Sequence, residues 1–300
     1  MELDYTNMIE AGVHFGHQKK RWNPKFKAYL YKHMHGISII DLERTQACLQ
    51  KACEFLTEQV ENGANVLLVG TKKQAQEIVR EVGQATSMPF CSNRWLGGCL
   101  TNFETVKASL AKYQRFLQME ESGELNKLPK KESAAIRREM VRMHRSFEGI
   151  LHMTKRPDVL LIVDAKHEAI AIHEAKRLGI PVIGIADTNS DPTVLDFPIP
   201  ANDDSVKSLR VIFDCLQEAI AQGVELKSLK KSDKGISRET AEAANKMVAK
   251  KHNTGRSSGK TTKRSGVKSE KAATKKAEAS KKEEAAVVEK KSEKEEAKAE

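Results

Sequence analysis

Short runs of apolar residues recur along the first three quarters of the chain, and amphipathic segments lie between them. The runs predict strands at 37–42, 64–69, 89–92, 158–163 and 182–186. Most of them are apolar at successive positions, which is typical of strands that are buried on both faces of a sheet. We therefore predict an α/β fold of the Rossmann-like or flavodoxin-like kind, with a parallel sheet and helices on both faces.

The segments between these runs repeat apolar residues with the spacing of amphipathic helices. The predicted helices span 43–61, 72–86, 167–178 and 203–222. Gly63, Gly179 and Gly223 follow three of these segments, and glycine is the commonest residue at the end of a helix. We expect the last helix to end at Gly223.

A long insertion separates the runs 89–92 and 158–163. Apolar side chains recur at intervals of three and four in 103–117 and again in 136–150, with Gly123 and Pro129 between the two parts. This pattern predicts an antiparallel coiled-coil hairpin. The hairpin could lie flat on the core, but its charged outer faces favour a projecting arm. The predicted domains are a core of 1–102 with 155–225, the hairpin 103–154, and a tail.

The tail, residues 226–300, differs from the rest in composition. It contains 22 Lys and Arg against 12 Asp and Glu, which accounts for the chain's whole net charge of +10. It is rich in Lys, Ala and Glu and nearly lacks aromatic residues, so it cannot bury enough apolar area to offset its chain entropy. We expect a disordered basic tail, with transient helix at 240–251.

Five cysteines, none in CxxC spacing, are typical of a reduced cytoplasmic protein. The residues after Met1 are acidic and form no apolar run, so we expect no signal peptide. The sequence contains no stretch of about 18 apolar residues, so we expect no membrane-spanning helix.

Two loops pair a tryptophan with an arginine. The first loop, residues 19–27, has five cations in nine residues, together with Trp22 and Phe26. The second loop, residues 93–102, contains Arg94, Trp95 and a Gly-Gly pair. Cations neutralise phosphates, and aromatic rings offer faces to bases. Each tryptophan could instead anchor its loop to the core.

Other candidate sites have weaker support. Gly70–Lys73 lies between a strand and a helix, where anions bind, but it lacks the spacing of a phosphate-binding P-loop. Carboxylates at strand ends permit an alternative, an enzyme acting on a phosphorylated small molecule. They are Asp164, Asp187 and Asp191, with Asn189 beside them. Such residues more commonly cap helices and turns. The pairs His14/His17 and His33/His35 have no cysteine nearby, so we expect no metal site.

The order of motifs resembles the bacterial form of the ribosomal protein S2 family. The matching segments are 8–17, 21–25, 93–98 with 100–103, 157–164, 187–192 and 199–205. The resemblance covers roughly residues 4–225. The tail departs from the family pattern, because members commonly end near the position of Gly223.

The resemblance implies a non-enzymatic structural constituent of the small ribosomal subunit, located in the cytoplasm. The implied partners are small-subunit (16S) rRNA, neighbouring ribosomal proteins and ribosomal protein S1, which it helps to seat; no cofactor, membrane or small-molecule substrate is implied. The predicted RNA-binding residues are Lys19, Lys20, Arg21, Trp22, Asn23, Lys25, Lys27, Lys72, Lys73, Asn93, Arg94, Trp95 and Asn102. A third alternative is a free nucleic-acid-condensing protein that acts through the tail alone.

Overall fold

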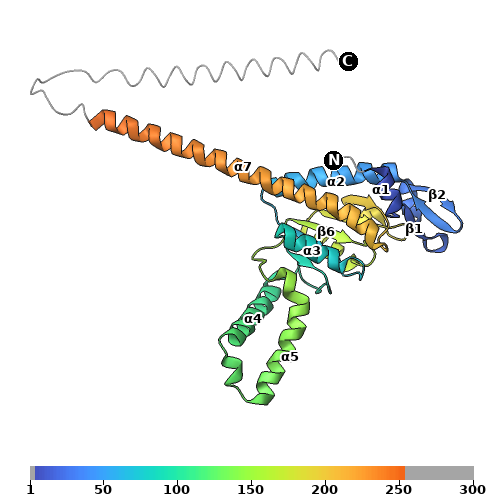
Figure 1. The fold of residues 1–300 in the computed structure, drawn as a ribbon, viewed down its shortest axis with the longest axis horizontal. Coiled ribbons are helices and arrows are strands. Elements are labelled where there is room, and N and C mark those ends of the chain that lie inside the picture. The colour runs from blue at the N-terminus through green and yellow to red at the C-terminus, as the bar shows by residue number, and fades with distance from the viewer. Residues whose placement is uncertain (1–3, 254–300) are drawn as a thin grey trace, which may run out of the picture. The chain divides into compact units, whose positions relative to one another are not determined.

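The structure is a computed structural model that describes residues 4–253, with side chains as far as Lys230. In chain order the elements are α1 (Tyr5–Glu10), β1 (Phe15–Gln18), η1 (Lys19–Arg21), η2 (Pro24–Tyr29), β2 (Leu30–Met34), β3 (Ile37–Ile40), α2 (Leu42–Glu61), β4 (Val66–Val69), α3 (Gln76–Thr86), β5 (Phe90–Cys91), α4 (Phe103–Glu121), η3 (Glu124–Asn126), α5 (Lys130–Phe147), η4 (Glu148–Ile150), β6 (Val159–Val163), α6 (Ala169–Leu178), β7 (Val182–Ala186), η5 (Pro192–Val194), β8 (Phe197–Pro200) and α7 (Val206–Asn253). Figure 1 shows their arrangement.

The main sheet has five parallel strands in the order β5-β4-β6-β7-β8. This is the flavodoxin-like order, so the predicted fold class is confirmed. Successive residues of β4 point into two different cores. Val66 and Leu68 join the core beneath α2, α3 and α7, while Leu67 and Val69 join the core beneath α6 and the base of the hairpin. Burial on both faces explains why these strands lack polar alternation.

Three strands escaped prediction. β8 contains Pro198 and Pro200, but it pairs with β7 alone at the edge of the sheet, where a missing N–H group costs no ladder bond. β1 and β2 flank β3 in a separate antiparallel sheet. The predicted strand 37–42 therefore lies outside the parallel sheet, and it ends at Ile40 because Asp41 caps α2.

The insertion between β5 and β6 forms the predicted hairpin from α4 and α5, which lie side by side and extend away from the sheet (Figure 1). Leu110, Tyr113 and Phe147 are buried and belong to one of the two cores of the fold. Gly149 lies so close to Phe90 that an added Cβ would stand 2.1 Å from the Phe90 carbonyl oxygen. The base of the hairpin is thus closely packed on β5. The predicted domain boundaries stay a prediction.

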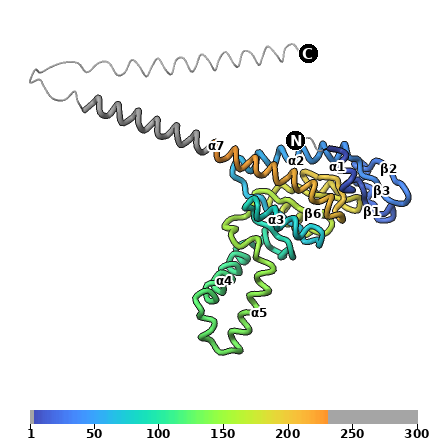
Figure 2. Tube along the Cα trace, in the orientation of Figure 1, coloured from blue at the N-terminus to red at the C-terminus, as the bar shows by residue number. Residues whose placement is uncertain are grey.

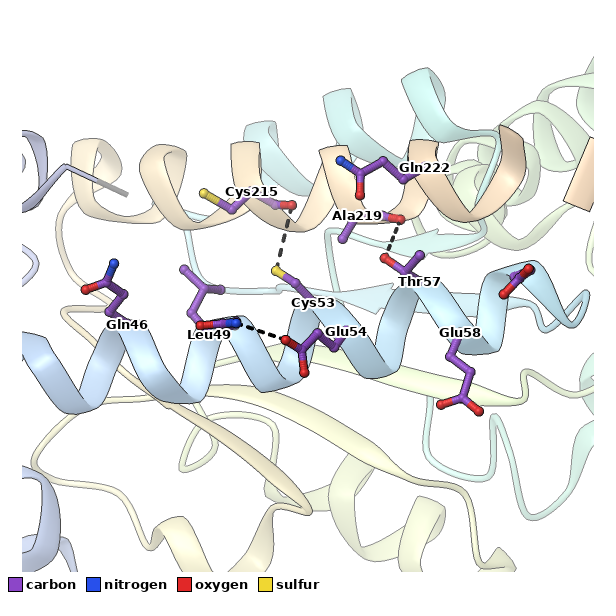
Figure 3. Close-up of a pocket in the computed structure, with 11 residues that line it drawn as sticks. Gln46, Leu49, Cys53, Glu54, Thr57, Glu58, Cys215, Ala219 and Gln222 are labelled. Atoms are coloured by element: carbon purple, nitrogen blue, oxygen red, sulfur yellow. Dashed lines mark hydrogen bonds between the residues drawn. The ribbon is translucent and has the colours of Figure 1, made fainter. Parts of the chain in front are cut away.

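The prediction that the last helix ends at Gly223 is wrong, because α7 continues to Asn253. Gly223 is a contact point between helices: a Cβ there would lie 2.8 Å from the Cβ of Val60 on α2. Figure 3 shows α2 and α7 packed along each other, with the Thr57 hydroxyl donating to the Ala219 carbonyl (3.0 Å). Residues 226–253 of the predicted tail belong to α7, and 254–300 lie outside the described residues. Figure 2 traces the part of α7 that runs beside α2.

Candidate nucleic-acid interface

The first loop is attached to the core by one aromatic side chain and by hydrogen bonds of its backbone. Phe26 is fully buried. The side chain of Asn23 caps η2 by accepting from the backbone N–H of Lys25 (3.0 Å). The backbone N–H of Asn23 donates to the carbonyl of Thr188 (2.8 Å). These bonds fix the backbone while the loop's cations project outward. Exposed cations of the loop are Lys19, Lys20, Arg21, Lys25 and Lys27.

Trp22 is only partly buried, and its ring packs edge-on against His33 at 5.3 Å between centroids. The indole Nε1 is buried and has no hydrogen-bond partner. Lys25 is exposed, but its ammonium lies 2.5 Å from a carboxylate oxygen of Asp191. Of the first loop's predicted contacts, Lys19, Lys20, Arg21 and Lys27 are exposed and have no ion-pair partner among the described residues.

Most hydrogen bonds that hold the second loop go to one carboxylate, that of Glu174 on α6. Its donors are Trp95 Nε1 (3.1 Å), the N–H groups of Gly98 (2.8 Å), Leu100 (3.0 Å) and Thr101 (3.1 Å), and the Thr101 hydroxyl (3.2 Å). Burial acts to raise the pKa of Glu174, but these hydrogen bonds outweigh it and hold the pKa below its usual value. Gly98 adopts a φ of 86°, a left-handed conformation that suits glycine.

The predicted contacts of the second loop divide into exposed and buried residues. Arg94 and Asn102 are exposed, and so is Asn93, whose side chain donates to the carbonyl of Arg145 on α5 (2.8 Å). Trp95 is 9% exposed. Its ring therefore anchors the loop to the core, which is the alternative reading of the sequence. The residue that organises the loop, Glu174, comes from 73 to 79 residues further along the chain.

Lys72 and Lys73 differ sharply in their surroundings. Lys73 is exposed. The Lys72 ammonium lies 2.8 Å from Asp203, 2.7 Å from Asp204 and 3.6 Å from Asp164, and only 15% of its side chain is exposed. Burial acts to lower the pKa of Lys72, but the bonds to the aspartates raise it above its usual value. Its charge is therefore already compensated inside the protein.

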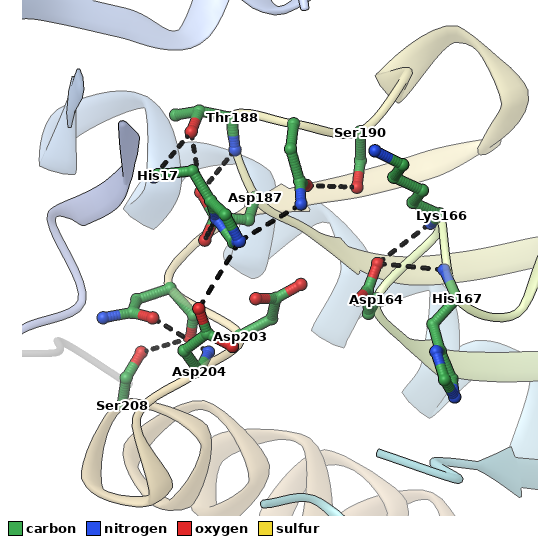
Figure 4. A network of polar contacts seen from close by, with 12 residues as sticks. His17, Asp164, Lys166, His167, Asp187, Thr188, Ser190, Asp203, Asp204 and Ser208 are labelled. Atoms are coloured by element: carbon green, nitrogen blue, oxygen red, sulfur yellow. Dashed lines mark hydrogen bonds and ion pairs between the residues drawn. The ribbon is translucent and has the colours of Figure 1, made fainter. Parts of the chain in front are cut away.

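Behind the first loop lies a cluster that sequence reasoning missed. It consists of His17, Asp187, Asp203 and Asp204, and we call it the acid cluster (Figure 4). The His17 Nδ1 lies 2.7 Å from Asp187, and its Nε2 lies 3.4 Å from Asp204. Gly16 permits this approach, because a Cβ there would stand 2.5 Å from Thr188 Cγ2. The hydrogen bond to Asp187, despite burial, raises the pKa of His17.

The acid cluster could hold a divalent cation. One ligand atom from each of its four residues lies within 4.8 Å of the others. Asp203 is 0% exposed, and its Oδ2 has no hydrogen-bond partner. Burial and the charges of Asp164 and Asp187 raise the pKa of Asp203 to about 8. An imidazole with three carboxylates suits zinc or a harder divalent ion, although the Lys72 ammonium already lies 2.8 Å from Asp203 and 2.7 Å from Asp204. The expectation of no metal site rested on local spacing, whereas these ligands are spread along the chain.

The remaining carboxylates at the strand ends serve as caps. Asp164 accepts from the backbone N–H groups of Lys166 (3.0 Å) and His167 (3.1 Å). Asp191 accepts from the N–H of Thr193 (3.0 Å). The amide nitrogen of Asn189 lies 3.2 Å from Nε2 of His17. Asp164 and Asp191 thus stabilise the backbone turns that follow them. Within the described residues, no helix has the length and apolar character needed to cross a membrane.

Comparison with known proteins finds one family over most of the chain. The family model described as Ribosomal protein S2 matches residues 8–223. A protein of Opitutus terrae named small ribosomal subunit protein uS2 is 53% identical over 244 residues, which is 81% of this chain and 81% of that protein. Proteins of the same name from Cytophaga hutchinsonii (46% identical, 75% of this chain and 87% of the relative) and Coprothermobacter proteolyticus (44%, 73% and 81%) are also similar. The chain therefore belongs to the ribosomal protein S2 family.

Proposed function

We propose that this chain is a structural constituent of the small ribosomal subunit in the cytoplasm, where it binds small-subunit rRNA, contacts neighbouring ribosomal proteins and helps to seat ribosomal protein S1. Its family is structural and non-enzymatic. The part of the proposal that concerns ribosomal protein S1 is supported by the family resemblance alone. The RNA contact is supported, in addition, by the two loops.

One observation supports the RNA contact: cations on the two anchored loops point into solvent and have no ion-pair partner among the described residues. Lys19, Lys20 and Arg21 in the first loop and Arg94 in the second are exposed and form no ion pair with any described residue. Backbone that is already fixed loses little entropy on binding. Each cation that neutralises a phosphate also releases counterions from the RNA.

The structure suggests different roles for the predicted contact residues. The exposed cations and the exposed amides Asn93 and Asn102 face solvent, where they can meet RNA. Trp95 and Asn23 hold the loops in place, whereas Trp22 is only partly buried beside the exposed cations. We propose Lys73 as the phosphate contact at the start of α3, because Lys72 is engaged by the aspartates.

A first test is sedimentation of tagged full-length protein in a cell lysate through a sucrose gradient. We expect stoichiometric co-migration with small subunits. Deletion of residues 254–300, which leaves α7 whole, should preserve it. Migration as a free protein would overturn the proposal. Loss of all binding on deletion would favour instead the alternative that the tail alone condenses nucleic acid.

A second test measures the affinity of the protein for transcribed small-subunit rRNA as salt is raised. Replacement of both Arg21 and Arg94 by alanine should weaken binding and reduce the slope against salt by about one for each lost phosphate contact. A matched control replaces Lys51 and Lys207, exposed lysines on α2 and α7 at the other face of the sheet. Equal effects in both variants would contradict a role for the loops.

A further inference from the structure

The outer face of α6 has a charge pattern that the proposed function does not use. Two acids belong to this helix and its N-terminal turn, and both are buried with internal partners. Glu168 accepts from the backbone N–H (3.0 Å) and the hydroxyl (2.5 Å) of Thr71, and Glu174 holds the second loop. Every basic side chain of the same segment is exposed. They are Lys166, His167, His173, Lys176 and Arg177.

All the charged side chains that this segment exposes are therefore basic. Lys166, Lys176 and Arg177 form no ion pair with any described residue, in contrast to Lys72 and Lys25. Figure 4 shows Lys166 and His167 where the segment leaves β6, with Asp164 bonded to their backbone N–H groups. A face that turns its acids inward and keeps its cations unpaired is suited to a polyanion.

A pocket of about 520 Å³ lies along this face. This volume is within the range of about 300–1,000 Å³ that small-molecule sites occupy. Ala169, Ile172 and Val194 give it an aliphatic wall. Lys166, Lys176 and His173 also line the pocket. Histidine is one of the side chains on which unstacked RNA bases are placed.

The pocket also borders the first loop. Asn23 belongs to its lining, and so does Asp191, whose charge is compensated by Lys25 at 2.5 Å. The same helix that lines the pocket carries Glu174, the anchor of the second loop. α6 thus contacts the structures that fix both loops, and its basic face connects them.

We infer that the outer face of α6 is a third RNA-binding site of this protein, with rRNA phosphates on Lys166, Lys176 and Arg177 and one nucleotide in the pocket beside His173. This inference rests on the proposed function and extends it. The two loops and α6 then form one continuous surface, which follows a longer stretch of RNA backbone than either loop alone.

The deciding experiment compares two full-length variants in binding to transcribed small-subunit rRNA over about 50–200 mM salt. The first replaces Lys166 and Lys176 by alanine, and the control replaces Lys51 and Lys207. We expect the α6 variant to lose at least about tenfold in affinity and about two in salt slope, while the control stays within about twofold of the native protein. Circular dichroism checks that both variants are folded.

The outcomes separate the inference from the proposed function. If the native protein binds with a steep salt dependence but the α6 variant behaves like the control, the inference about α6 is wrong, and RNA binding by the two loops remains supported. If the native protein does not bind the rRNA, the proposed function itself fails.

Ultraviolet crosslinking of assembled small subunits, read by mass spectrometry, tests the pocket directly. A nucleotide adduct on His173 is the expected result. Crosslinks from Lys166 and Lys176 to a neighbouring protein with an amine-reactive reagent, without nucleotide adducts under ultraviolet light, would overturn the inference in favour of a protein contact. The exposed Ile170 on the same helix would then be the natural apolar anchor of that contact.

Discussion

The first loop and the second loop each place an arginine beside a tryptophan, and in each the arginine faces solvent while the tryptophan turns inward. The second loop depends on one carboxylate, Glu174, which accepts from its indole and its backbone. The first loop depends on the buried Phe26 and on backbone bonds, and its indole N–H has no partner. Identical residue pairs therefore need not share an anchoring mechanism, because the partner comes from elsewhere in the fold.

The largest expected effect follows from replacing Glu174 by alanine. Several donors of the second loop would be left without a partner at a buried site, so we expect the free energy of unfolding to fall by about 3–5 kcal/mol. Urea unfolding measures it. Replacement of the exposed Glu43 on α2 is the control and should change stability by less than about 0.5 kcal/mol. A Glu174 variant as stable as that control would remove the distinction between the loops.

Addition of a divalent cation should stabilise the side of the molecule that carries the first loop. Binding to the acid cluster at a hundred times its dissociation constant would raise the free energy of unfolding by about 2.7 kcal/mol. Thermal unfolding with zinc and with magnesium measures the shift. Asp203→Asn should abolish it, because Asp203 contributes the buried carboxylate that has an unpartnered oxygen. The same rise in the variant would show that the cation binds elsewhere.

A matched pair of substitutions compares the two tryptophans. Trp95→Phe removes a hydrogen bond to a carboxylate and should cost about 1.5–3 kcal/mol of unfolding free energy. Trp22→Phe removes a buried N–H group that has no partner, so it should cost less than about 1 kcal/mol. Chemical denaturation of both variants gives the difference. Equal costs would mean that the two loops are anchored alike.

A smaller effect concerns acid. The folded-state pKa of Glu174 lies below its ordinary value of 4.5, so its stabilising contribution is fully present above pH 4.5 and is lost as pH falls through the folded-state pKa. The stability difference between the native protein and Glu174→Gln should shrink below about pH 4.5. A difference that stays constant in acid would show that the charge of Glu174 contributes nothing.

The core strands could be predicted because the signal is local. Val66–Val69, Val159–Val163 and Val182–Ala186 are apolar at every position except Gly184, as strands covered on both faces require. β8 could not be predicted in the same way, since its two prolines are tolerated only because the strand lies at the edge. The end of the last helix was mispredicted at Gly223 for a similar reason. Only the close approach of α2 shows that this glycine is needed for helix packing and not for a helix end.

The sequence by itself determined the α/β class, the hairpin insertion and the positions of the basic loops, because apolar periodicity and charge are properties of neighbouring residues. Tertiary structure alone decided which of these charges remain free. It paired Lys72 with aspartates, turned Glu174 toward the second loop and brought His17 to Asp187, which is 170 residues away. Such pairings depend on which strand ends meet at one edge of the sheet, and local sequence does not carry that information.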